Sequence, residues 1–192
     1  MVVHASRADK GRPVLFLVGF GLVLLALIVV ARADAHPKVI DFRDTCSGHR
    51  ADGHNHADTI YGSRICANTP DIFRGLFGDD RIFGYLGDDT LLKGSKGDDH
   101  VFGGVGDDRV EGSDGADRLD GGPGADRVEG GSGHDRILGG LGGDRLFGQD
   151  GSDHIRGQAG DDFIDCGGGS NDEAWGGAGN DTFVNCDGNT HQ

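Results

Sequence analysis

Glycine, aspartate and large aliphatic residues recur every nine positions from Gly75 onward. The segment from Gly103 to Glu111 shows the whole pattern, with glycine at positions one, two and four, aspartate at six and an aliphatic residue at eight. Aligned copies begin at Gly75, Gly84, Gly94, Gly103, Gly112, Gly121, Gly130, Gly139, Gly148 and Gly157, and a last good copy covers Gly176 to Val184. A period of this length is typical of solenoids, in which each repeat is one unit of a stack.

Each copy predicts a tight turn followed by a short strand. Glycines in the first six positions allow positive φ, and in a strand over the last three positions the middle side chain points to one side. Because one such strand buries too little to stand alone, the copies have to stack. The eighth positions then share a thin core, and they are Ile82, Leu91, Val101, Val110, Leu119, Val128, Ile137, Leu146, Ile155, Ile164 and Phe183. We expect an all-β parallel β-roll, a two-sheet β-solenoid of about ten to twelve repeats with 18 residues per turn.

The repeat is irregular at both ends of the array. Lys93 is interpreted as a one-residue insertion and Trp175 as an extra residue. The copy from Cys166 is degraded, with Asn171 where aspartate is expected, so we predict no complete site there. The segments 58–62 and 71–75 resemble half-copies that precede the array.

Stacking places the sixth-position aspartates in two columns, one along each edge of the roll. They are Asp80, Asp89, Asp99, Asp108, Asp117, Asp126, Asp135, Asp144, Asp153, Asp162 and Asp181. Carboxylates on neighbouring turns repel one another, and the 157 residues after Ala35 already carry 30 acidic and 14 basic side chains. A hard divalent cation would remove the repulsion and supply folding energy, and all-oxygen ligands favour Ca²⁺ over Mg²⁺ in flexible loops.

The array resembles the RTX (hemolysin-type) calcium-binding nonapeptide repeat. The resemblance covers Gly75 to Val184, and it implies a parallel β-roll with several Ca²⁺ ions between successive turns, ligated by the eleven aspartates and by turn carbonyls. Acidic residues at the fifth position are expected to add negative potential more than direct bonds: Asp79, Asp88, Asp98, Asp107 and Asp161. The alternative of a disordered acidic linker does not explain the regular aliphatic eighth position.

The amino terminus has the order of an export signal. A mostly basic start precedes the uncharged segment 13–31, and a small-residue site ends at Ala35. The apolar run Val14–Val30 is at the lower limit for spanning a bilayer, so an uncleaved anchor is the alternative to cleavage. We therefore divide the chain into a signal peptide or anchor (1–35), a Cys/His-rich leader and cap with half-repeats (36–74), the β-roll (75–184) and a short tail (185–192).

Export makes disulfides the expected state of the four cysteines. Cys46 and Cys66 are 20 residues apart, as are Cys166 and Cys186, and loop closure favours these pairings among the three that four cysteines allow. The first pair would close a short N-terminal cap on the roll.

The leader also contains His49, His54 and His56 near Asp52 and Asp58. These side chains could bind Zn²⁺ or Cu²⁺, which would suit a metal-dependent enzyme. The spacing matches no specific site, and a polar loop that caps the first turn is the interpretation we favour.

Two series of outward-facing side chains could contact a binding partner. Arginines occupy the seventh position in six copies: Arg81, Arg109, Arg118, Arg127, Arg136 and Arg145. Glu111 and Glu129, at the ninth position, are close enough to pair with Arg109 and Arg127. Phe83, Leu92, Phe102, Leu138 and Phe147 fall on ninth positions, which also point outward. A basic stripe suits a polysaccharide or an envelope phosphate.

These observations predict a secreted calcium-binding protein with a structural or interaction role. No His-Glu-x-x-His or Gly-x-Ser-x-Gly motif occurs in the sequence, so we expect no catalysis. The net charge of −14 argues against a nucleic-acid partner. Calcium ions are the expected partners, together with a cell-surface or extracellular component, and we expect no membrane attachment once the signal is cleaved. The rival hypothesis is a surface adhesion protein held by Val14–Val30.

Overall fold

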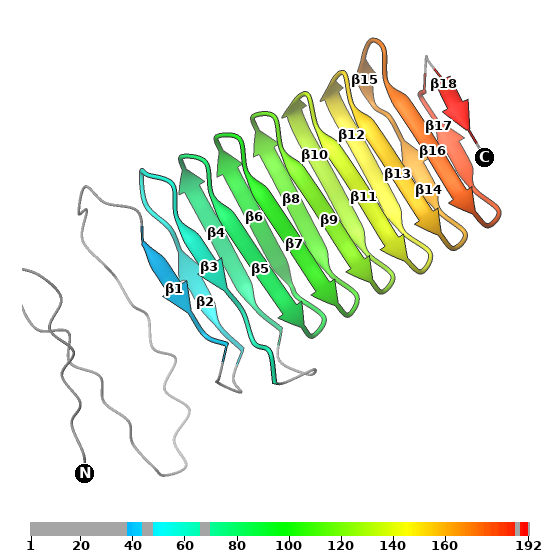
Figure 1. Cartoon of the computed structure of the whole chain (residues 1–192). Helices are drawn as coiled ribbons and strands as arrows, with labels where there is room; N and C mark the ends of the chain where they lie inside the picture. Colours follow the sequence, from blue (N-terminus) through cyan, green and yellow to red (C-terminus); the bar gives the residue numbers. More distant parts are fainter. Residues whose placement is uncertain (1–37, 44–47, 66–69, 187–188, 192) are drawn as a thin grey trace, which may run out of the picture.

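The chain winds into a parallel β-solenoid whose successive strands alternate between two sheets (Figure 1). The computed structural model describes residues 38–43, 48–65, 70–186 and 189–191. The predicted signal peptide and the pair Cys46 and Cys66 lie outside the described residues. The described residues contain no helix that is long and apolar enough to cross a membrane.

The first sheet contains the odd-numbered strands up to β13, followed by β16 and β18. Its strands, in spatial order, are β1 (Val39–Asp41), β3 (Thr59–Tyr61), β5 (Arg81–Leu86), β7 (His100–Val105), β9 (Arg118–Pro123), β11 (Arg136–Leu141), β13 (His154–Ala159), β16 (Glu173–Ala178) and β18 (Asn189–His191).

The second sheet lies opposite and contains the strands between them. They are β2 (Arg50–Asp52), β4 (Ile72–Phe77), β6 (Leu91–Lys96), β8 (Arg109–Asp114), β10 (Arg127–Gly133), β12 (Arg145–Gly151), β14 (Phe163–Asp165) and β17 (Thr182–Val184), with β15 (Gly168–Gly169) paired to β12. The predicted all-β two-sheet roll is confirmed.

The roll includes part of the segment that the repeats alone assign to the leader. Strands β1 and β3 join the first sheet and β2 joins the second. The two half-copies therefore form coils of the same solenoid, with Ile60 and Phe73 fully buried at the eighth position.

The parallel pairing keeps equivalent positions of the repeat in register. Val110 lies opposite Val128, which lies opposite Leu146, so partners are 18 residues apart. The eighth positions form a single buried column between the sheets, and Phe183 packs partly buried against its end. This thin apolar column is the core that the repeat predicts.

The repeat alignment is wrong around Lys93. Leu92, and not Leu91, is fully buried, because Leu92 pairs with Phe73 while Leu91 pairs with Ile72. The extra residue is therefore accommodated between Asp89 and Leu91, and Leu92 does not belong to the outward-facing series.

The alignment is also wrong around Trp175. Ala174 is buried at the eighth position and Trp175 follows it at the ninth, so Trp175 is no extra residue. The additional residue lies in the glycine-rich turn before Asp172. Asp172, and not Asn171, then occupies the sixth position and is buried.

The turns depend on glycine at the fourth position. Gly106, for example, has φ of +136°, and a Cβ there would collide with the carbonyl of Gly87 on the preceding coil. A side chain at this position is thus opposed by both backbone conformation and the close stacking of coils.

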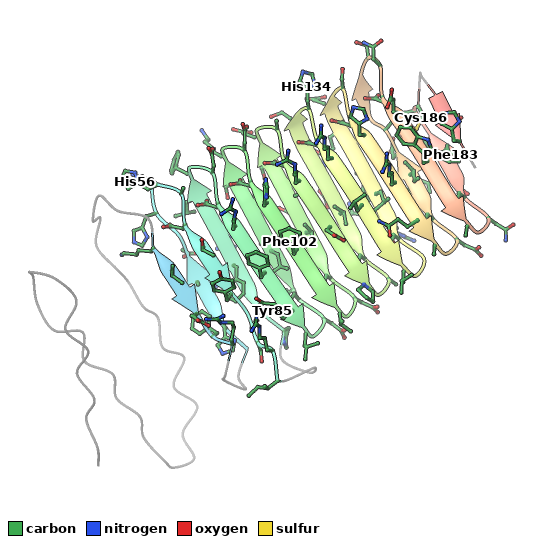
Figure 2. All side chains as sticks on the ribbon, in the orientation of Figure 1. His56, Tyr85, Phe102, His134, Phe183 and Cys186 are labelled. Carbon is green, nitrogen blue, oxygen red and sulfur yellow. A yellow bond between two sulfur atoms is a disulfide. The ribbon has the colours of Figure 1, made fainter. Side chains whose placement is uncertain are left out.

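The second predicted disulfide is present. Cys166 and Cys186 are bonded, with their Cα atoms 5.0 Å apart, at the C-terminal end of the roll (Figure 2). The bond links coils that already stack, since the Cys166 amide donates to the carbonyl of Val184.

Candidate metal sites

Two columns of buried aspartates run along the roll, one at each edge where the chain passes between sheets. The first column precedes strands of the first sheet and contains Asp58, Asp80, Asp99, Asp117, Asp135, Asp153 and Asp172. The second column precedes strands of the second sheet and contains Asp71, Asp89, Asp108, Asp126, Asp144, Asp162 and Asp181. All eleven sixth-position aspartates expected from the repeat are therefore buried in these columns.

A chain of hydrogen bonds connects the aspartates of each column. The backbone N–H of each aspartate donates to Oδ1 of the aspartate on the next coil, as from Asp89 to Asp108 and from Asp108 to Asp126. The distances between donor and acceptor are 2.6–3.1 Å along both columns. Oδ1 is thus satisfied by the backbone and fixes the direction of the carboxylate.

The second carboxylate oxygen has no such partner over most of the roll. Within the described residues, Oδ2 is buried without a hydrogen bond in Asp71, Asp80, Asp89, Asp99, Asp108, Asp117, Asp126, Asp135, Asp144, Asp153, Asp162 and Asp181. An ionised carboxylate is costly to bury unless a charge or a donor compensates it. Unpaired buried oxygens repeated on successive coils therefore fit a bound cation that would compensate their charge.

The proton affinity of the columns reflects this cost. Burial, reinforced by neighbouring aspartates, raises the pKa of Asp99 and Asp108 to about 8. Burial also raises the pKa to about 7 in Asp80, Asp89, Asp135 and Asp144, and to about 6 in Asp117 and Asp126. Without a cation, the columns therefore hold many protons at neutral pH.

The donor set fits a hard, oxygen-seeking cation. A Cβ placed on Gly103 would lie 2.5 Å from Asp108 Oδ2 and 2.5 Å from the carbonyl oxygen of Gly121, so these two oxygens converge on one point. The described residues contain no group of three or more His, Cys, Asp or Glu side chains around one point. A cation in the columns would consequently take carbonyl as well as carboxylate oxygens, which is the chemistry Ca²⁺ prefers.

The fifth-position acids have a direct structural role. Oδ1 of Asp79 accepts the backbone N–H of Asp98, whose own Oδ1 accepts the N–H of Ala116. Asp88, Asp107 and Asp161 accept the fifth-position N–H of the next coil in the same way. These side chains therefore bond neighbouring turns to each other, in addition to contributing negative charge.

At the N-terminal end of the roll, nitrogen groups contact the first aspartate of each column. In the second column, the backbone N–H of His49 donates to Asp71 Oδ1, and His49 Nδ1 lies 2.9 Å from the same oxygen. His49 itself occupies the sixth position of its coil and stacks on Phe42, with ring centroids 4.4 Å apart.

Asp58 ends the first column in a comparable way. Its Oδ1 accepts the backbone N–H of Lys38 and its Oδ2 accepts that of His54. Lys38 Nζ lies 3.1 Å from His54 Nε2. The histidines predicted as alternative zinc or copper ligands thus lie at the ends of two different columns, and His56 is exposed.

Sequence reasoning missed Asp58, Asp71 and Asp172 as members of the columns. A signal for the first two was present, because each begins a half-copy with a large apolar residue two positions later. Asp172 was missed because a single extra residue in its turn shifted the alignment.

The family comparison matches the part of the chain that forms these coils. A model of the RTX calcium-binding nonapeptide repeat (4 copies) matches residues 68–92, 91–119, 102–137, 111–146, 138–171 and 167–189. The chain belongs to the RTX calcium-binding nonapeptide-repeat family. A comparison with curated proteins finds no match. Membership identifies the roll as a calcium-binding RTX structure, and the columns supply the acidic oxygens that such binding requires.

Proposed function

We propose that this RTX protein is exported and folds outside the cytoplasm when Ca²⁺ becomes available. In this proposal it serves a structural or interaction role and catalyses no reaction. The observation that carries it is the repeated buried Oδ2, because each such oxygen lacks a donor while its carboxylate is aimed by the bond to Oδ1.

The eleven predicted aspartates, together with Asp71, are the residues we propose to hold the ions, because Oδ2 of each is buried without a hydrogen bond. When bound, Ca²⁺ would supply the positive charge that the described side chains do not bring to the columns. The protein's own contribution is to hold one oxygen of each carboxylate by a backbone N–H and to present the other. Extracellular modules bind Ca²⁺ with dissociation constants of about 10⁻⁴–10⁻³ M, so ambient calcium outside a cell would be sufficient.

The test is far-UV circular dichroism of the full chain in non-ionic detergent, after chelation and during titration with Ca²⁺ or Mg²⁺. We expect a cooperative gain of β signal with Ca²⁺ and little with Mg²⁺. Reduction of Cys166–Cys186 in a parallel sample separates the stabilisation by the disulfide from that by the ion. A fully formed roll in chelator under reducing conditions would refute the proposal.

Export is tested separately by intact-mass analysis of the mature protein. A chain that begins at His36 would support cleavage after Ala35, whereas a retained Val14–Val30 segment would favour the anchored adhesion protein.

A further inference from the structure

The outer face of the first sheet bears a row of basic side chains, which we call the basic ladder. It consists of Arg81, His100, Arg118, Arg136 and His154, all at the position that begins a strand. Strand register places each opposite the next on β5, β7, β9, β11 and β13. At a strand spacing of about 4.8 Å the ladder is about 19 Å long.

The arginines of the ladder have no carboxylate partner. Within the described residues, the side chains of Arg81 and Arg136 make no hydrogen bond or ion pair, and the side chain of Arg118 contacts only His100, with Nη1 2.7 Å from His100 Nε2. Burial and the charges of Arg118 and Arg81 lower the pKa of His100, which indicates positive potential along the row. The chain has a net charge of −14, so a row of positive side chains is unusual in it. Calcium binding by the aspartate columns does not explain this row.

Two of the three seventh-position arginines on the second sheet are neutralised, whereas Arg145 has no ion pair within the described residues. Arg109 Nη2 lies 2.6 Å from Glu111 Oε1, and Arg127 Nε lies 2.7 Å from Glu129 Oε1. Lys93 also pairs with Glu111 at 3.0 Å. The two faces thus carry seventh-position arginines in the same register but differ in whether glutamates accompany them.

The acidic groups near the ladder leave its centre positive. Glu173 pairs with His154 at the C-terminal end of the row. Asp120 lies between Arg118 and Arg136 in sequence, is half-buried on β9, and makes no ion pair with either within the described residues. Burial raises the pKa of Asp120.

A column of aromatic rings flanks the N-terminal part of the ladder, beside Arg81 and His100. Tyr61, Phe83 and Phe102 stack along the face, with ring centroids 5.2 and 4.9 Å apart, and Tyr85 packs beside Phe83. Figure 2 shows Tyr85 and Phe102 on this same face of the roll. The half-buried rings cover one another's faces and present their edges as an apolar strip at the N-terminal end of the positive row.

We propose that this face binds a linear acidic polysaccharide, with its carboxylates on the ladder arginines and its sugar rings along the aromatic strip. Arginine pairs with carboxylates through two parallel hydrogen bonds, and a hexuronate unit is about as long as the spacing between neighbouring strands. A single row of charges matches one extended chain, whereas membrane binding uses protruding apolar groups spread over a surface. The strongly negative remainder of the protein disfavours the dense charge of a nucleic acid.

The test is calorimetric titration of the calcium-loaded full chain, in non-ionic detergent, with a short oligogalacturonate and with a neutral oligosaccharide of equal length. We expect binding of the acidic oligosaccharide alone, weakened at about 1 M salt because the Debye length falls to about 3 Å. The double variant Arg118→Gln/Arg136→Gln should weaken binding about tenfold. The matched double variant Arg109→Gln/Arg127→Gln on the second sheet removes the same charge and should change it less than twofold.

Circular dichroism in calcium checks that each variant is folded. If the variant Arg118→Gln/Arg136→Gln does not fold, Arg81→Gln is used in its place. Equal weakening by both double variants would overturn the proposal, since net charge alone would then explain binding. Absence of binding at low salt would also overturn it, as would binding to anionic phospholipid vesicles without binding to the oligogalacturonate.

Discussion

At the N-terminal end of the roll Asp58 has a hydrogen-bond donor on each carboxylate oxygen, whereas Asp108 in the middle has a donor on Oδ1 alone. Both residues occupy the sixth position of their coils and both are buried. The difference is that residues outside the repeat, Lys38 and His54, reach Asp58. The comparison teaches that the columns need an added cation only where the chain supplies no nitrogen donor of its own.

The largest effect on stability should come from changing the pH, which protonates the aspartates in the middle of both columns together. Because burial raises the pKa of these aspartates, the ion-free fold binds more protons than the unfolded chain. Their contribution to ion-free stability is complete below the unfolded pKa of about 4 and is lost as pH rises through about 6 to 8. We expect the β signal in chelator to increase on acidification from pH 8 to 5, measured by circular dichroism. An ion-free signal that does not change over this range would contradict the proposed state of the columns.

The second prediction compares the same substitution, aspartate to asparagine, at Asp108 and at Asp58. Asp108→Asn keeps an acceptor for the Asp89 N–H but removes a charge that lacks compensation. We expect it to increase the β signal in chelator at neutral pH, measured by circular dichroism, and to destabilise the fold in calcium by about 1–3 kcal/mol, measured by urea unfolding. Asp58→Asn should destabilise the fold in both conditions, because the amide N–H₂ would meet the donors of Lys38 or His54. The same sign of change for Asp108→Asn in both conditions would remove the distinction between the two sites.

The third prediction concerns the end of the second column. His49→Ala removes the imidazole that contacts Asp71 Oδ1 and stacks on Phe42. We expect a loss of about 1–2 kcal/mol in the free energy of unfolding in calcium, and no larger loss because the backbone N–H remains. His49→Asp provides the contrast: it extends the column by one carboxylate and should make stability depend more strongly on calcium.

The smallest effect is expected on the outer face of the second sheet. Glu129→Gln removes a part-buried ion pair with Arg127 on the outer face, so the free energy of unfolding should change by less than about 1 kcal/mol and the calcium midpoint should not move. A large shift of that midpoint would mean that surface charge, and not the buried columns, controls the response to calcium.

The repeat allowed the fold to be predicted because its aspartate and its aliphatic residue have fixed phase. Ile137 and Asp135 are buried as the nine-residue pattern requires. Prediction was wrong where one extra residue entered a copy, since Leu91 and Leu92 are both aliphatic and composition does not tell which one is buried. The contacts of His49 and His54 were also beyond the sequence, because neither histidine lies in a segment where the repeat can be recognised.

Each nine-residue copy makes half a turn of the roll, and this limits how copies can be added or removed. Equivalent partners are 18 residues apart, so two copies complete one turn. Duplicating a pair of copies would leave every later residue on its present sheet. Duplicating a single copy would move all later residues to the opposite sheet and divide the basic ladder between the faces. The parity of the copy number, more than the number itself, therefore determines which side chains share a surface.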